Sequence, residues 1–160
     1  MPKGLTMKPT RYLLTIVITV LLWTGCSRKE PAPPPSALYS VNGGTTSHKN
    51  GQICLTCHVT GGSAVNFVIA GSVFKADSVT PSSNGILYFW TQQGGTGLLV
   101  ATLEVDANGN FFTNSSILPA LGAFPQMRGI SGAVKNMPIL ALTGNCNSCH
   151  GVNEAPIWIN

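Results

Sequence analysis

Two short stretches of the chain share the pattern C-x-x-C-H: Cys54 to His58 and Cys146 to His150. Two cysteines at this spacing, followed by a histidine, form the pattern by which a protein bonds covalently to the vinyl groups of a c-type haem. The histidine then stands beside the porphyrin as the proximal ligand of the iron. The two motifs therefore predict two covalently bound haem c groups and, with them, one-electron redox chemistry.

Other sites can use the same four cysteines. A structural zinc site built from two C-x-x-C pairs usually has the pairs about 15–20 residues apart, whereas Cys57 and Cys146 are much farther apart in this chain. A disulfide framework leaves the two histidines unexplained. A thioredoxin-like redox pair needs a βαβ context, which the sequence does not indicate. Haem attachment is the interpretation that accounts for both the cysteines and the histidines.

The fifth cysteine, Cys26, belongs to an export signal. Residues 1–25 have a basic start, then an apolar run from Tyr12 to Trp23, then small residues. This is the layout of a secretory signal peptide, and the apolar run is too short for a membrane-spanning helix. An uncleaved anchor and a plain signal peptide are the alternatives to a lipoprotein signal.

The segment from Leu22 to Cys26 resembles a bacterial lipobox, although Trp23 stands where lipoproteins usually carry leucine. The resemblance implies that Cys26 is lipidated and becomes the mature N-terminus, and multiple acyl chains anchor a protein stably. Ser27 follows the cysteine, rather than the Asp that resembles an inner-membrane retention signal. We therefore expect an exported outer-membrane lipoprotein that faces the periplasm or the cell surface.

Removal of residues 1–25 changes the charge balance. The whole chain carries a net charge of +4, but three of its nine basic residues lie in this segment, which leaves six against five acidic ones. The propionates of two haems would make the holoprotein acidic. A nucleic-acid partner needs a clustered basic face, so none is expected. Low charge leaves little repulsion between copies, and the expected partners are redox proteins or further copies of the chain, besides the membrane that holds the N-terminal lipid.

Composition divides the mature chain into four segments. Residues 26–38 form a Pro-rich, extended tether. Residues 39–63 are a first haem-binding segment rich in Gly, Asn and Thr, residues 64–138 are a β module, and residues 139–160 are a second haem-binding segment. No stretch outside the signal has a helical period. The predicted fold class is mainly β: a small antiparallel β-sandwich flanked by two loop-rich haem-binding segments.

The strands of the module are predicted from apolar and β-branched runs. Gly71, inside the first run, indicates a bulge or a close approach. Asp106–Asn110 contains Asn-Gly and predicts a hairpin turn; it falls far short of a calcium loop, so a plain turn is expected. The predicted strands are Val65–Lys75, Ile86–Thr91, Leu98–Val105, Phe111–Asn114, Met127–Ser131 and Ala133–Leu142.

The β module resembles the transthyretin-like and carboxypeptidase-regulatory-like β-sandwich modules of secreted bacterial proteins. The matching residues are Ile69 to Val73 (IAGSV), Ala101 to Asp106 (ATLEVD) and Asn108 to Phe111 (NGNF). The resemblance covers about half of the chain. Such modules are mostly structural or adhesive, so the resemblance implies a scaffold rather than an activity.

The haem segments are similar to multihaem c-type cytochromes, most clearly over the run from His48 to His58 (HKNGQICLTCH). The similarity covers a short stretch around each motif. It implies a di-haem cytochrome lipoprotein with His58 and His150 as proximal iron ligands. The implied thioether donors are Cys54, Cys57, Cys146 and Cys149.

The number of histidines restricts the distal ligands. Two bis-histidine haems need four imidazoles, and the chain has three histidines; exchange between identical copies does not change this ratio. His48, six residues before Cys54, is the expected distal ligand of one haem, with an ordinary solvated histidine as the alternative. The other iron would take Met137 or Met127, which raises its potential relative to a second histidine, or remain open. Neither methionine follows His150 as in small monohaem cytochromes.

The sequence leaves the distance between the two haems open. If an odd number of up-and-down strands separates the motifs, the haems lie at opposite poles and meet only between copies. Head-to-tail contact of that kind grows open filaments. An even number of strands brings both haems to one end as a compact relay.

The leading hypothesis is a di-haem c-type cytochrome, not an enzyme, that carries electrons across or outside the bacterial outer envelope. A head-to-tail cytochrome filament is one form that it would take. The alternatives are a small peroxidase-like or reductase-like haem enzyme with an open axial position, and a β-sandwich binding or adhesion module with haems as redox sensor. An enzyme would need a polar distal pocket, for which the chain has no spare histidine.

Overall fold

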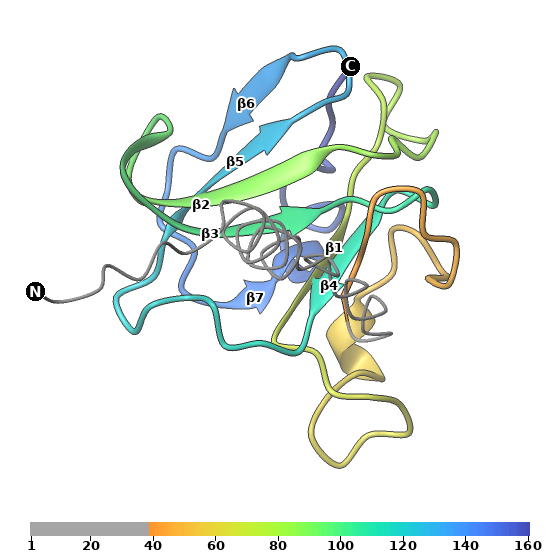
Figure 1. Ribbon diagram of the computed structural model, residues 1–160. Coiled ribbons are helices and arrows are strands. Elements are labelled where there is room, and N and C mark those ends of the chain that lie inside the picture. The colour runs from red at the N-terminus through yellow and green to blue at the C-terminus, as the bar shows by residue number, and fades with distance from the viewer. Residues whose placement is uncertain (1–38) are drawn as a thin grey trace, which may run out of the picture. The chain divides into compact units, whose positions relative to one another are not determined.

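Strand β1 (Ile69–Ser72) lies at the centre of the computed structural model, which describes residues 39–160. All four of its residues are buried. On one edge β1 pairs antiparallel with β4 (Asn110–Thr113), and on the other edge it pairs parallel with β7 (Gly144–Asn145). These three strands form the smaller of two sheets (Figure 1).

The second sheet has four antiparallel strands in the order β3-β2-β5-β6. Buried and partly exposed side chains alternate along the first part of β2, as the two-residue period of a strand requires. Both outer strands of this sheet carry mostly exposed side chains. The bounds of the strands are β2 Ile86–Gln92, β3 Thr96–Glu104, β5 Phe124–Arg128 and β6 Val134–Asn136.

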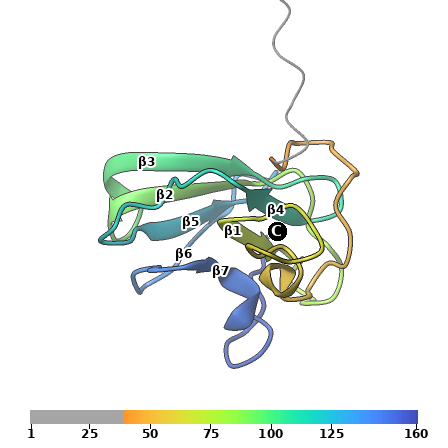
Figure 2. The same cartoon turned by 90° about the horizontal axis from the view of Figure 1, so that it is seen from below.

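The hydrophobic core lies between the two sheets. Ile69, Val73 and Phe111 contribute from the side of the smaller sheet. Leu87, Phe89, Leu103 and Met127 contribute from the larger one. Figure 2 shows the two groups of strands, with the four-stranded sheet to the left of β1 and β4. The described residues are thus mainly β in a sandwich-like, two-sheet arrangement without an α-helix, which confirms the coarse fold prediction.

Most predicted strands are present, with changed lengths. The predicted strand Val65–Lys75 is reduced to β1, and β5 begins three residues before the predicted Met127. The last predicted strand, Ala133–Leu142, is reduced to the three residues of β6. Pro138 follows closely, and a proline has no backbone N–H to donate to a neighbouring strand.

The predicted hairpin is wrong. Asp106–Asn110 does form a tight turn, in which Asp106 Oδ1 accepts hydrogen bonds from the backbone N–H of Asn108 and of Asn110, each at 2.9 Å. However, the strands that the turn joins belong to different sheets, because β3 pairs with β2 while β4 pairs with β1. The turn therefore carries the chain from one sheet to the other.

The purely antiparallel sandwich is also corrected at one pair, because β1 and β7 run parallel. Strand β7 falls inside the segment 139–160, which the sequence assigned to haem binding alone. A side chain at Gly144 would place its Cβ 2.6 Å from Ile69 Cα, so only glycine permits this close pairing. All described residues belong to one compact unit.

The predicted signal peptide (1–25), its lipidation site Cys26 and the tether (26–38) lie outside the described residues. Within residues 39–160, no helix is both long and apolar enough to cross a membrane.

The predicted close approach at Gly71 is confirmed, and it gives a first prediction. A Cβ at this position would lie 2.9 Å from Cys146 Cβ and would also clash with Phe111 Cζ. Gly71 does not have a positive φ. Without the clash, Gly71→Ala would therefore stabilise the protein by about 0.4–1 kcal/mol.

With the clash, we expect Gly71→Ala to lower the free energy of unfolding by about 1–3 kcal/mol, as overpacking does. Urea-induced unfolding of both proteins measures this difference. The sign of the change in the free energy of unfolding is the test, because a stabilised Gly71→Ala variant would contradict the close packing of β1 against Cys146.

Candidate functional site

The two C-x-x-C-H motifs adopt the same local structure. The first begins with the 3₁₀ helix η1 (Cys54–Thr56), and the second with η2 (Cys146–Ser148). In each motif the backbone N–H of the histidine donates to the backbone carbonyl of the first cysteine at 3.0 Å. Because side chains at i and i+3 eclipse in a 3₁₀ helix, the two thiols of each motif lie on one face of its turn.

Each motif histidine is held by a backbone carbonyl. His58 Nδ1 lies 2.7 Å from Val65 O, and His150 Nδ1 lies 2.9 Å from Ala155 O. A carbonyl only accepts hydrogen bonds, so Nδ1 carries the proton and the neutral ring keeps a lone pair on Nε2. This is the arrangement by which a second partner orients a metal-ligating histidine.

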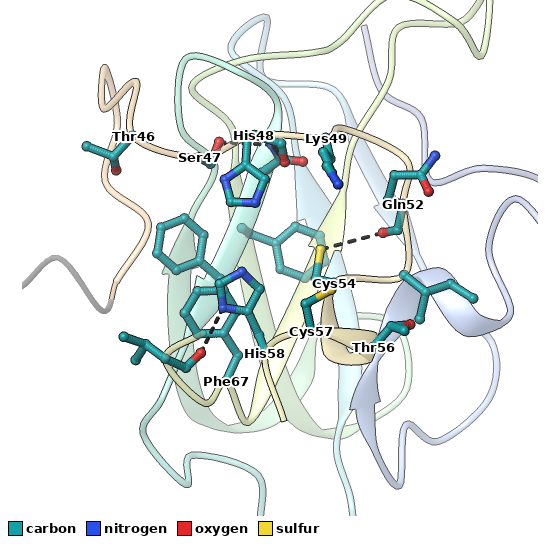
Figure 3. Close-up of a pocket in the computed structure, with 15 residues that line it drawn as sticks. Thr46, Ser47, His48, Lys49, Gln52, Cys54, Thr56, Cys57, His58 and Phe67 are labelled. Carbon is teal, nitrogen blue, oxygen red and sulfur yellow. Dashed lines mark hydrogen bonds between the residues drawn. The ribbon is translucent and has the colours of Figure 1, made fainter. Parts of the chain in front are cut away.

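A cavity of about 420 Å³ lies beside the first motif. Cys54, Cys57, His58 and His48 line it together with an apolar wall that includes Phe67, Phe111 and Phe112. Its volume is in the usual range for cofactor sites, about 300–1,000 Å³. Figure 3 shows the two imidazole rings and the two sulfur atoms converging on this space.

A stack of aromatic rings fixes His58. Its ring lies parallel to that of Phe67, with centroids 4.0 Å apart and an interplanar angle of 5°. Phe67 in turn stacks on Phe112, with centroids 4.8 Å apart. Phe112 belongs to β4 and is buried, so the imidazole is tied to the smaller sheet.

His48 lies across the cavity from His58. The two ring centroids are 5.9 Å apart, at an interplanar angle of 39°. With metal–nitrogen bonds of about 2.0 Å, two imidazoles on opposite sides of one metal ion have centroids roughly 6 Å apart. The separation therefore matches two axial ligands of one iron. His48 is exposed, which an ordinary solvated histidine also is.

The residues around the first cavity suit a haem group. A covalently attached haem uses two thiols side by side, an imidazole with a free Nε2 and an apolar wall for the porphyrin, and a sixth ligand completes the coordination where one is present. Cys54 and Cys57 would supply the thiols, His58 the imidazole and Phe67 part of the apolar wall, and His48 lies where it could supply a second imidazole.

The second motif borders a different cavity, of about 240 Å³. His150 lines it together with both sequence-predicted methionines, Met127 and Met137. Met127 is 3% exposed and belongs to the hydrophobic core, whereas Met137 is half-buried in the cavity wall. Cys146 and Cys149 do not line this cavity.

A cation also faces the second cavity. The Lys135 ammonium lies over the ring of Trp158, in a cation–π contact, and both residues line the cavity. Desolvation lowers the pKa of Lys135 from its ordinary value. The first cavity has two histidines and the amine of Lys49, whereas the second has one histidine, two thioethers and the amine of Lys135.

The two motifs lie side by side. Both 3₁₀ helices contact β1, and Asn147 Nδ2, inside the second motif, donates to the carbonyl of Gln52 at 2.8 Å, just before the first motif. Residues 39–160 contain seven strands, an odd number, yet the motifs are not at opposite poles. The strand-counting argument assumed up-and-down strands and does not apply, because the strands divide between two sheets and β7 runs parallel to β1.

The four thiols have unequal environments. Burial, together with charge on the nearby Cys54 and Cys149, raises the pKa of the Cys146 thiol to about 12. Burial also raises the pKa of Cys54. Cys57 and Cys149 are exposed. Each motif thus has one shielded and one accessible thiol.

Among residues 39–160, no group of three or more His, Cys, Asp or Glu side chains converges to hold a metal ion. The two C-x-x-C pairs are therefore not assembled into the four-ligand cage that structural zinc takes. A scan against protein-family models and searches of curated proteins and of solved structures gave no match for this chain.

The structure adds site residues that the sequence did not indicate. Phe67 was part of a predicted strand, and Trp158 and Lys135 had no motif. Asn147 occupies one of the two unrestricted positions of the second motif, so nothing in the pattern distinguished it.

The thiol environments predict an order of alkylation in a chain produced without haem and kept reduced. A raised pKa leaves less thiolate at a given pH, and the thiolate is the nucleophile. We expect iodoacetamide at neutral pH to label Cys57 and Cys149 well before Cys54 and Cys146, as read by peptide mass spectrometry. Raising the pH should accelerate labelling of Cys54 before that of Cys146. Equal rates in the folded chain, as in a urea-unfolded control, would contradict the shielding.

Proposed function

We propose that this chain is a di-haem c-type cytochrome that transfers electrons in the bacterial outer envelope and does not itself turn over a substrate. The observation that carries the proposal is the repeated site: two C-x-x-C-H motifs with the same turn and the same carbonyl-held histidine. A bound haem iron would supply a one-electron couple between its ferric and ferrous states.

The chain's residues would have distinct tasks. Cys54, Cys57, Cys146 and Cys149 would form the thioether bonds that keep the cofactor from leaving. Val65 O and Ala155 O would orient His58 and His150, with Nδ1 protonated and Nε2 toward the metal. The aromatic wall at Phe67, Phe111 and Phe112 would exclude water on one side of the first site.

The adjacent motifs favour a relay within one copy over haems that meet only between copies. Electrons would enter at one site and leave at the other, toward a redox partner or toward the next copy in a head-to-tail filament. The envelope location rests on the export signal and Cys26, which lie outside the described residues.

The haem content is tested on three holoproteins: the native chain, Cys54→Ala/Cys57→Ala and Cys146→Ala/Cys149→Ala. Intact mass should show two covalent haems on the native chain and one on each double variant. Dithionite should reduce the native holoprotein reversibly, with no turnover of peroxide, nitrite or oxygen. A native chain with one haem or none would overturn the proposal, and rapid peroxide or nitrite turnover would favour the enzyme alternative.

The second cavity predicts which methionine ligates the second iron. Met137 lies half-buried in the wall of the cavity that His150 also lines, whereas Met127 is packed into the core. We expect Met137→Leu to abolish the methionine-to-iron charge-transfer absorption of the oxidised holoprotein. Met137→His would provide two imidazoles and lower the potential of that haem on the order of 0.1 V, since axial ligands set haem potentials over about 0.8 V.

Met127→Leu is the matched control, because the exchange conserves volume and usually costs less than about 1.5 kcal/mol of stability. It should leave the spectrum and both potentials unchanged. An absorption lost in Met127→Leu but kept in Met137→Leu would reverse the assignment. The absence of this absorption from the native protein would leave the second iron without methionine.

A further inference from the structure

Three buried polar side chains form a hydrogen-bonded cluster between the two motifs. Ser72 of β1, Asn110 of β4 and Asn147 of η2 are each at most 3% exposed. Ser72 Oγ donates to Asn110 Oδ1 at 2.7 Å, and Asn147 Nδ2 donates to Ser72 Oγ at 3.1 Å. The Ser72 backbone N–H donates to Asn147 Oδ1 at 3.0 Å. A buried polar network whose members are paired rigidifies its surroundings.

The cluster holds the loop 47–52, which carries His48. The Gly51 N–H donates to Ser72 Oγ at 2.8 Å, and Asn147 Nδ2 also donates to Gln52 O at 2.8 Å. Asn110 Nδ2 donates to Ser47 Oγ at 2.9 Å and to His48 O at 3.4 Å. Each end of the loop is thus attached to a buried side chain.

The turn between β3 and β4 also holds this loop, because Asn108 Nδ2 donates to Ser47 O at 2.7 Å and Asn50 Nδ2 donates to Asn108 O and Gly109 O at 3.2 Å. The loop's own backbone contributes one turn, in which the Gln52 N–H donates to Lys49 O at 3.1 Å, and Lys49 has a strained φ of 52°. The His48 side chain is exposed, and its ring lies near that of His58. Its position therefore depends on where the backbone of the loop is held.

We infer that Ser72, Asn110 and Asn147 are positioning residues for His48, so that the second motif helps to hold the distal ligand of the first haem. The inference rests on the proposed function, because His48 is a ligand only if a haem lies between its ring and His58. It adds a coupling between the two sites: a change inside the second motif alters the ligation of the first iron.

The size of the effect follows from the bonds lost. Leucine at position 147 keeps the approximate shape of asparagine but leaves the buried Ser72 N–H without its acceptor and removes the Asn147 donor from Gln52 O. A loss of about 1–2 kcal/mol of stabilisation changes an equilibrium constant by a factor of 5–30. We therefore expect the ratio of detached to ligating His48 to rise roughly 5- to 30-fold in Asn147→Leu.

The test compares holoproteins of Asn147→Leu, Ser148→Ala and His48→Ala with the native protein. Ser148 occupies the other unrestricted position of the same motif, and its Oγ hydrogen bonds stay within that segment, to Asn145 O at 2.7 Å and to the neighbouring Cys149 Sγ at 3.9 Å, so it is the matched control. His48→Ala identifies the spectrum of a first haem that has lost this ligand. Low-spin ferric resonances and the affinity for added imidazole report the ligation of each iron.

We expect Asn147→Leu to shift the first haem toward the His48→Ala spectrum, with tighter imidazole binding and an altered first potential. The second haem and the Ser148→Ala protein should keep native values. If Asn147→Leu does not accumulate, Ser72→Ala removes the shared hydroxyl and makes the same prediction.

A native-like first haem in Asn147→Leu or in Ser72→Ala would overturn the inference. A change confined to the second haem in either of these two variants would also overturn it. These outcomes leave the proposed function intact. A native protein without haem would instead overturn the proposed function itself.

Discussion

The positions of both motifs depend on strand β1, which is short and closely packed. Its four residues have β4 on one edge and β7 on the other, and both 3₁₀ helices contact it. Two glycines permit this crowding: Gly71 leaves room for Cys146 and Phe111, and Gly144 leaves room for the backbone of β1. Because the second motif follows directly after β7, parallel pairing with β1 is what brings it next to the first.

The sequence predicts the chemistry of the site better than its geometry. The motif residues and strands such as β2 are recognisable because local spacing and apolar periodicity define them. The error at Asp106–Asn110 has a local cause, since Asn-Gly forms the same tight turn whether the next strand pairs back or enters another sheet. Strand β7 is two residues, Gly144 and Asn145, with no strand propensity of their own, so only tertiary pairing reveals it.

Polar composition misled in a related way. Gly, Asn and Thr in residues 39–63 indicated a loop, and apart from η1 that segment is indeed mostly loop. Yet Ser72, Asn110 and Asn147 are among the most buried residues of the chain. Their burial is tolerable because each donor and acceptor finds a partner across the sheet, which a single sequence does not reveal. Exposed apolar side chains flank the motifs instead: Ile53, Val59 and Val65 near the first, and Leu140, Leu142 and Val152 near the second. An apolar prosthetic group would cover such surface.

The asymmetry between the sites arises from the surroundings rather than from the motifs. Both motifs have the same turn and the same protonated Nδ1, so their proximal sides are alike. The difference lies in the cavities, because His48 lines the cavity beside the first motif whereas Met127 and Met137 line the cavity that His150 borders. Three histidines for four axial positions allow at most one bis-histidine iron in a di-haem chain that supplies its own ligands. Since methionine ligation raises a haem potential relative to a second histidine, adjacent sites of this kind would give electrons a preferred direction, from the first motif to the second.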